Sequence, residues 1–153
     1  MLDREAIAAL IPHQGAMCLL DRVIEWDRDH IVLATGTHRS PGNPLRLDGR
    51  VRAVHLCEYS AQAMAVHGGL CAQADGRGAR AGHLVSLRDV TLRVDFLDDL
   101  EGELQVSATR LLETAAGWHY AFEVRHHDLT LAAGRAAIMA RGRRSGSLRE
   151  QVR

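Results

Sequence analysis

Apolar and polar residues alternate with a period of two through most of the second half of the chain. The alternation is clear over residues 90–96, 104–109 and 118–125, and residues 129–139 add one more apolar segment. Alternation of this kind is typical of strands in an antiparallel sheet that buries one of its faces. The pattern predicts about four strands in this half of the chain.

The first half predicts a hairpin and a single long helix. Residues 17–26 and 30–37 are rich in Leu, Val and Ile and are separated by a polar turn, which is typical of two hairpin strands. Residues 53–72 contain no Pro and are rich in Ala, Met, Leu and Gln, which favours a helix that ends in the Gly-rich stretch 75–78. A short helix is expected over Asp3–Leu10, with Asp3 as its N-cap.

A long loop precedes the predicted long helix. Residues 39–52 contain two Pro and two Gly residues, which break regular structure, and a connection of this length is usually functional or disordered. One long helix after two strands and before about four more excludes an alternating parallel βα array. The order predicts an α+β fold in which one long central helix is wrapped by an antiparallel sheet.

Composition indicates an ordinary soluble domain. The 153 residues suit a single domain, which we expect over residues 1–140, followed by a flexible Arg-rich C-terminal tail over residues 141–153. Nineteen basic and nineteen acidic residues cancel, which argues against binding to nucleic acid or to an anionic membrane surface. No apolar run reaches the roughly 18 residues of a membrane span. The N-terminus lacks the pattern of a signal peptide, so we expect a cytoplasmic protein.

Neither a disulfide framework nor a metal site is expected. The three Cys residues form no CxxC pair. His126 and His127 are adjacent but have no third ligand at a familiar spacing. No metalloprotease, serine hydrolase or dinucleotide-binding motif is present in the sequence.

Glu58 is the first candidate for chemistry. It lies near the start of the predicted helix among apolar neighbours, where a carboxylate costs free energy unless it is paired, and where the protonated form suits a general acid. The alternative is a carboxylate on the exposed helix face, stabilised by the helix dipole. The backbone N–H groups of Ala53, Val54 and His55 point out of the same helix start and are suited to polarising a thioester carbonyl.

Two segments then resemble a known enzyme family. Residues 11–23 (IPHQGAMCLLDRV) resemble the opening of 3-hydroxyacyl-[acyl carrier protein] dehydratases, and residues 58–68 (EYSAQAMAVHG) resemble their central helix. With Asn43-Pro44-Leu45 and Asp48-Gly49-Arg50, these segments are most similar to the dehydratase-like proteins of aryl polyene pigment clusters. The resemblance implies a hotdog fold, in which an antiparallel sheet wraps around one long helix.

The resemblance also implies a reaction and a site. In these dehydratases a His before the central helix removes the C2 proton of a 3-hydroxyacyl thioester, and a Glu or Asp in the helix protonates the leaving hydroxyl. The pair usually spans two subunits of a dimer. Glu58 matches the position of the acid, but Pro44 stands where the family has its His. His13, His38 and His55 are the candidates for the base, in that order.

Further expectations follow from the same resemblance. Asn43, Gln62 and the N–H groups of Ala53, Val54 and His55 are expected to bind substrate. The substrate brings its own phosphopantetheine arm, so no cofactor is expected. The expected partners are an acyl carrier protein and a second hotdog subunit, in a homodimer or a heterodimer. Two alternatives stay open: a hotdog thioesterase whose helix carboxylate activates water, and a non-catalytic subunit that completes a partner dehydratase.

Overall fold

The structure is a computed structural model that describes residues 1–141. The predicted tail lies outside the described residues, apart from Arg141. The strands are β1 (Leu2–Asp3), β2 (Arg22–Trp26), β3 (His30–Thr35), β4 (Gly82–Leu92), β5 (Leu104–Thr114), β6 (Gly117–His126) and β7 (Leu129–Ala140). The helices are α1 (Arg4–Ala8) and α2 (Leu56–Ala74), with 3-10 turns at Gly15–Met17, Thr37–Arg39 and Ala53–His55.

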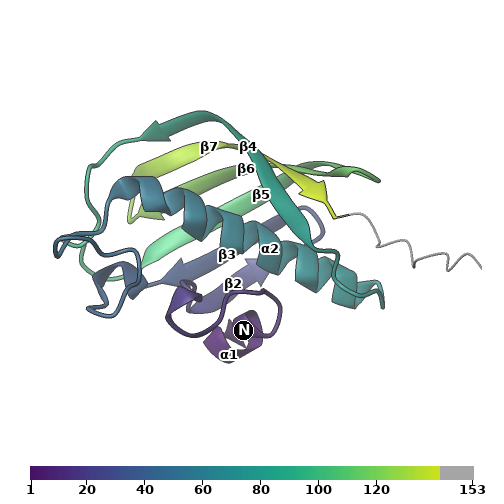
Figure 1. Cartoon of the computed structure of the whole chain (residues 1–153), viewed down its shortest axis with the longest axis horizontal. Coiled ribbons are helices and arrows are strands. Elements are labelled where there is room, and N and C mark those ends of the chain that lie inside the picture. Colours follow the sequence, from purple (N-terminus) through teal and green to yellow (C-terminus); the bar gives the residue numbers. More distant parts are fainter. Residues whose placement is uncertain (142–153) are drawn as a thin grey trace, which may run out of the picture.

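Within residues 1–141, a sheet of seven strands and one long helix make up the fold (Figure 1). The strands lie in the order β1-β2-β3-β5-β6-β7-β4, and each neighbouring pair is antiparallel. α2 lies across one face of the sheet, where it meets mainly β3, β5 and β6. The predicted α+β architecture and the leading β2–β3 hairpin are therefore confirmed. No helix in this part of the chain has the length and hydropathy that a membrane crossing requires.

A stripe of buried residues holds α2 on the sheet. Its members recur at intervals of three and four residues, which places them on one face of the helix. They are Leu56, Tyr59, Ala63, Val66 and Leu70. The helix ends where the sequence predicts, because Asp75 is its C-cap and Gly76 follows with a φ of 66°. The predicted cap of α1 is also present, since the side chain of Asp3 accepts from the N–H of Ala6 at 3.0 Å.

The predicted strand over residues 90–96 is correct only up to Leu92, because the observed strand begins and ends earlier. β4 ends at Leu92, and the chain then turns toward the start of α2. There Phe96 forms an isolated bridge with Arg52, and the carbonyl of Asp95 accepts from the N–H of Ala53 at 2.9 Å. The alternation after residue 92 therefore reflects packing against the start of the helix. The predicted strand over residues 17–26 is also shorter, because its first residue belongs to a 3-10 turn.

β7 and β4, at one edge of the sheet, extend beyond α2. β4 pairs only with β7, at the edge of the sheet. Leu84, Leu87 and Leu92 of β4 pair with Ile138, Ala136 and Ala132 of β7. The same β7 residues pair with Trp118, Tyr120 and Val124 of β6, so the leucines share the inner, helix-facing side of the sheet. These β4 leucines are 39–43% exposed, and two bulges interrupt the strand.

Candidate active site

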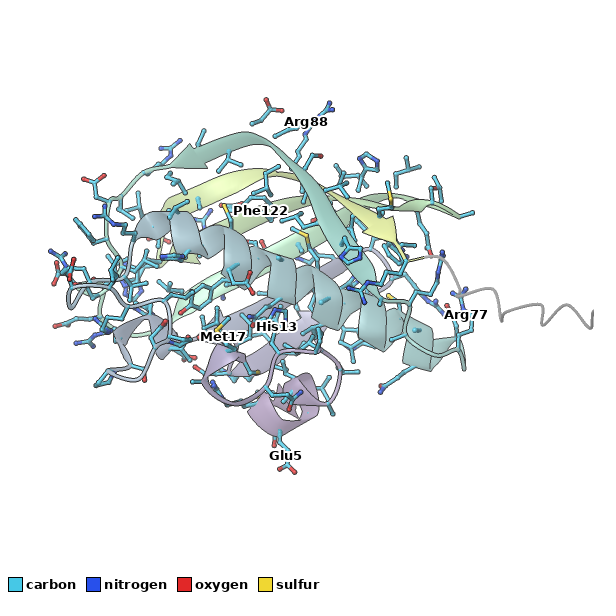
Figure 2. All side chains as sticks on the ribbon, viewed as in Figure 1. Glu5, His13, Met17, Arg77, Arg88 and Phe122 are labelled. Atoms are coloured by element: carbon cyan, nitrogen blue, oxygen red, sulfur yellow. The ribbon has the colours of Figure 1, made fainter. Side chains whose placement is uncertain are left out.

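His13 and Glu58 meet beside the first turn of α2. The distance between Nε2 of His13 and Oε1 of Glu58 is 3.1 Å, and the side chains are 32% and 34% exposed. His13 comes from the segment between α1 and β2, which lies against α2 (Figure 2). Of the three candidate histidines, His13 is the one that the structure brings to Glu58. Both groups belong to one chain, whereas the family resemblance implies a pair that spans two subunits.

Gln62 joins this pair to the backbone. It lies one turn after Glu58 and is fully buried. Its Nε2 donates to Oε1 of Glu58 at 3.0 Å and to the carbonyl of Met17 at 2.8 Å, and its Oε1 accepts from the N–H of Leu19 at 3.0 Å. Because a backbone N–H can only donate and a carbonyl can only accept, the two backbone contacts fix which way the amide points. Gln62 therefore ties the segment that carries His13 to the helix that carries Glu58.

Further hydrogen bonds hold the segment that carries His13 against α1. Nε2 of Gln14 donates to the carbonyls of Ala8 and Ile11, at 2.9 and 3.2 Å. Arg4 donates to the carbonyl of Gly15 at 3.3 Å, and Gly15 has a φ of 58°, a conformation that glycine adopts with little strain. The segment is therefore fixed to α1 as well as to α2.

These contacts decide where protons can reside in the pair. Oε1 of Glu58 accepts from Nε2 of Gln62 and lies 3.1 Å from Nε2 of His13, so a proton on the carboxyl group is better placed on Oε2. Nδ1 of His13 is buried and has no hydrogen-bond partner in residues 1–141, so a lone pair there is out of reach of a substrate. With the ring hydrogen on Nδ1, Nε2 is the proton acceptor and a protonated Oε2 is the donor, which is the combination that acid and base catalysis needs.

The other two histidines occupy different surroundings. His38 is fully buried, and its Nε2 bonds to the carbonyl of Leu100 at 2.7 Å. Burial lowers the pKa of His38, which keeps the ring neutral. His55 is half-buried at the end of the turn before α2. The structure brings neither ring to Glu58.

The predicted substrate-binding groups are largely engaged within the chain. Asn43 is buried; its Nδ2 donates to the carbonyl of Thr37 and to Oη of Tyr59, and its Oδ1 accepts from the N–H of Leu45. Asn43 therefore organises the loop before α2. At the helix start, the N–H of Ala53 donates to the carbonyl of Asp95, and that of His55 donates to the carbonyl of Arg52 at 3.1 Å.

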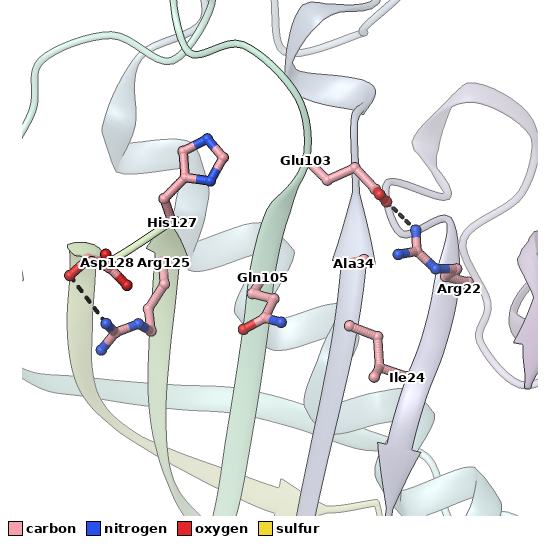
Figure 3. Close-up of a pocket in the computed structure, with 8 residues that line it drawn as sticks. All are labelled: Arg22, Ile24, Ala34, Glu103, Gln105, Arg125, His127 and Asp128. Carbon is pink, nitrogen blue, oxygen red and sulfur yellow. Dashed lines mark hydrogen bonds and ion pairs between the residues drawn. The ribbon is translucent and has the colours of Figure 1, made fainter.

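A hollow of about 510 Å³ lies on the outer face of the sheet (Figure 3). Its floor includes Ala34 and Gln105, which pair across β3 and β5 beside the buried Leu33 and Val106. Because neighbouring residues of a strand point to opposite faces, the hollow lies on the other side of the sheet from α2. It is therefore separate from Glu58. Its two guanidinium groups, of Arg22 and Arg125, already contact Glu103 and Asp128.

The bridge made by Gln62 is the main feature that the sequence argument missed. A residue four positions after Glu58 lies on the same helix face, so the Gln62–Glu58 contact could be predicted from spacing alone. The contacts of Gln62 with Met17 and Leu19 could not, because they depend on the path of a distant segment. Among residues 1–141, no cluster of three or more His, Cys, Asp or Glu side chains is arranged to hold a metal ion.

Comparisons with known proteins agree with this architecture. The family model ApeP-like, described as ApeP dehydratase, matches residues 5–145. The dehydratase heterocomplex ApeI:P from Xenorhabdus doucetiae has a TM-score of 0.78 and 22% identity, covering 90% of this chain and 91% of that chain. A thioesterase from Haemophilus influenzae has a TM-score of 0.65 and 10% identity, covering 93% and 92%. A hypothetical thioesterase with coenzyme A from Streptococcus pneumoniae has a TM-score of 0.58 and 11% identity, covering 81% and 88%. These similarities show the hotdog fold, and a comparison with curated proteins gave no match.

Proposed function

The chain belongs to the ApeP-like dehydratase family, and from this premise we propose that it converts 3-hydroxyacyl thioesters on an acyl carrier protein to trans-2-enoyl thioesters and water. The observation that supports this reaction is the contact of 3.1 Å between His13 and Glu58. A dehydratase needs a base and an acid on one substrate, and this contact supplies both groups side by side.

The proposed reaction assigns one role to each side chain. His13 takes the proton from C2, the electron pair of that C–H bond forms the C2–C3 double bond, and the bond between C3 and the hydroxyl oxygen breaks. Glu58 gives its proton to the leaving hydroxyl, which departs as water. The hydrogen bond of Gln62 favours Oε2 as the oxygen that carries this proton, because Oε1 accepts from Gln62. The phosphopantetheine arm arrives with the substrate, so no bound cofactor takes part.

An acidic carrier protein is the proposed source of the substrate. The loop before α2 presents two exposed guanidinium groups, of Arg39 and Arg52. Guanidinium groups bind phosphate and carboxylate oxygens well. Replacing both with Glu should raise KM for a carrier-bound substrate more than KM for a short thioester that lacks the carrier. Equal effects on the two substrates would contradict docking at this loop.

A second hotdog subunit is the proposed partner. The β4 leucines (Leu84, Leu87 and Leu92) leave an apolar inner face beyond α2, and a contiguous exposed apolar patch favours protein association. The most similar dehydratase structure described above is itself a heterocomplex. We propose that another hotdog chain, of the same or a different sequence, covers this face.

Mass spectrometry of the carrier-bound acyl chain tests the reaction. A 3-hydroxyacyl carrier protein incubated with the chain should lose one water, and Glu58→Gln and His13→Asn should each abolish the loss. Glu25→Gln, an exposed position on β2, serves as the matched control. Release of the whole acyl group would favour the thioesterase alternative, which the thioesterase neighbours keep open. Water loss that requires a co-purified second subunit and survives both substitutions would favour a non-catalytic role.

A further inference from the structure

His13 and Glu58 come from the same chain, and this arrangement has a consequence for the assembled protein. We infer that each chain carries a complete His13–Glu58 pair that acts within that chain, so that a neighbouring subunit lends it no catalytic group. The inference rests on the proposed function for its chemistry. It departs from the arrangement that the family resemblance implies, in which the pair spans two subunits.

The segment that carries His13 is bound to the α2 of its own chain. Gln62 binds the carbonyl of Met17 and the N–H of Leu19, four and six residues after His13, and the nitrogen that binds Met17 also contacts Glu58. Moving His13 to the Glu58 of another chain would break these bonds. It would leave the N–H of Leu19 buried and unpaired, which is costly.

The histidine of the family-like loop is also held within its own chain. His38 is the residue of the loop that resembles the family motif, and it is fully buried with Nε2 on the carbonyl of Leu100. Arg46 donates to the carbonyl of His38 at 3.2 Å and to that of Ser40 at 3.0 Å, which fixes the backbone that follows His38. His38 is therefore a structural residue of its own chain.

Mixed pairs of chains distinguish the two arrangements. Two differently tagged copies are co-expressed and purified through both tags, so that every pair contains one copy of each. A pair of wild type with the double variant His13→Asn/Glu58→Gln should keep about half of the wild-type rate, because one chain holds an intact site. A pair of His13→Asn with Glu58→Gln should show no more activity than either variant alone. A pair that spans two subunits predicts the reverse result in both experiments.

Nuclear magnetic resonance gives a test that does not need activity. The ring nitrogens of the histidines are labelled with ¹⁵N in one chain, and the His13 signals are assigned by their loss in His13→Asn. Glu58→Gln in the labelled chain should shift these signals, whether the chain is alone or paired. Glu58→Gln only in the unlabelled partner should leave them unchanged. Signals that respond to the partner's substitution alone would overturn the inference.

The two tests separate this inference from the proposed function. Wild-type pairs that dehydrate no substrate would refute the proposed reaction, while the NMR shifts would still decide whether the pair lies within one chain. Active wild-type pairs that lose all activity next to the double variant would refute the single-chain pair and leave the reaction standing.

Discussion

Replacing Gln62 with Met should separate the His13 segment from α2 with little change in side-chain volume. The substitution removes three hydrogen bonds, to Leu19, Met17 and Glu58. It leaves the buried N–H of Leu19 and the partly buried carbonyl of Met17 unpaired. Each buried polar group left without a partner costs about 1–3 kcal/mol, and the cost for the carbonyl is reduced because water can reach it. The free energy of unfolding should therefore fall by about 2–4 kcal/mol. This is a large fraction of the total for a domain of this size.

Urea unfolding followed by circular dichroism measures this loss. The matched control is Gln73→Met, an exposed position on the same helix, where the change should stay within about 0.5 kcal/mol. The slope of the unfolding free energy against urea should be the same for both variants, since the same surface is exposed on unfolding. A Gln62→Met protein that unfolds at the same urea concentration as the Gln73→Met protein would refute the bridge.

The same variant should also lose catalytic rate. Without Gln62 the distance between His13 and Glu58 is no longer fixed, and a misplacement of about 1 Å can cost roughly 100-fold in rate. Because Gln62 contacts Glu58 directly, its replacement should lower kcat while KM changes little. A rise in KM at unchanged kcat would indicate that Gln62 binds substrate instead of positioning the pair.

Three other predictions follow from the packing of the sheet. Burial lowers the pKa of His67 and of His38 below the usual value of 6.5, so the unfolded chain binds more protons as the pH falls through that value, and stability should drop from about pH 7.5 to 5.5. His67→Gln should reduce the drop measured by urea unfolding, and the part due to His38 should remain. Gly134→Ala should lower the stability of the fold by about 1–3 kcal/mol in thermal unfolding, because the added Cβ would lie 2.8 Å from Cζ of Phe122. The control Gly68→Ala should raise the stability by about 0.5–1 kcal/mol, because its added Cβ would have nothing within 4 Å. Leu87→Arg should leave the circular dichroism spectrum unchanged, because the position is 39% exposed, but should abolish the association with a second subunit that light scattering measures. A dimer that persists in this variant would exclude β4 as the interface.

Local signals in the sequence were sufficient for most of the elements. Asp3 predicted the start of α1, and the glycines after residue 75 predicted the end of α2, because caps act over one turn. The predicted end of the strand near residue 92 was wrong. Alternation indicates that one face of a segment is buried, but it does not indicate which element covers that face. Residues 94–97 are covered by the start of α2, a contact that no local pattern reveals.

The candidate site could likewise be predicted only in part from local signals. Glu58 could be chosen from its place in an apolar helix, and its contact with Gln62 follows from spacing. The choice of His13 over His38 could not be derived from spacing. It depends on how the segment after α1 crosses α2, which is set by backbone bonds to a side chain more than 40 residues away.

The place of β4 in the sheet has a consequence for how the chain is made. β4 is the fourth strand to leave the ribosome, yet its one neighbour within residues 1–141, β7, is the last of the described strands. At about 5–20 residues per second, the strand waits roughly 2–10 s for the 48 residues that separate its last residue from the end of β7. During that wait its leucines have no strand to join. The two bulges in β4 make it a poor template for other chains, and so reduce aggregation before synthesis is complete.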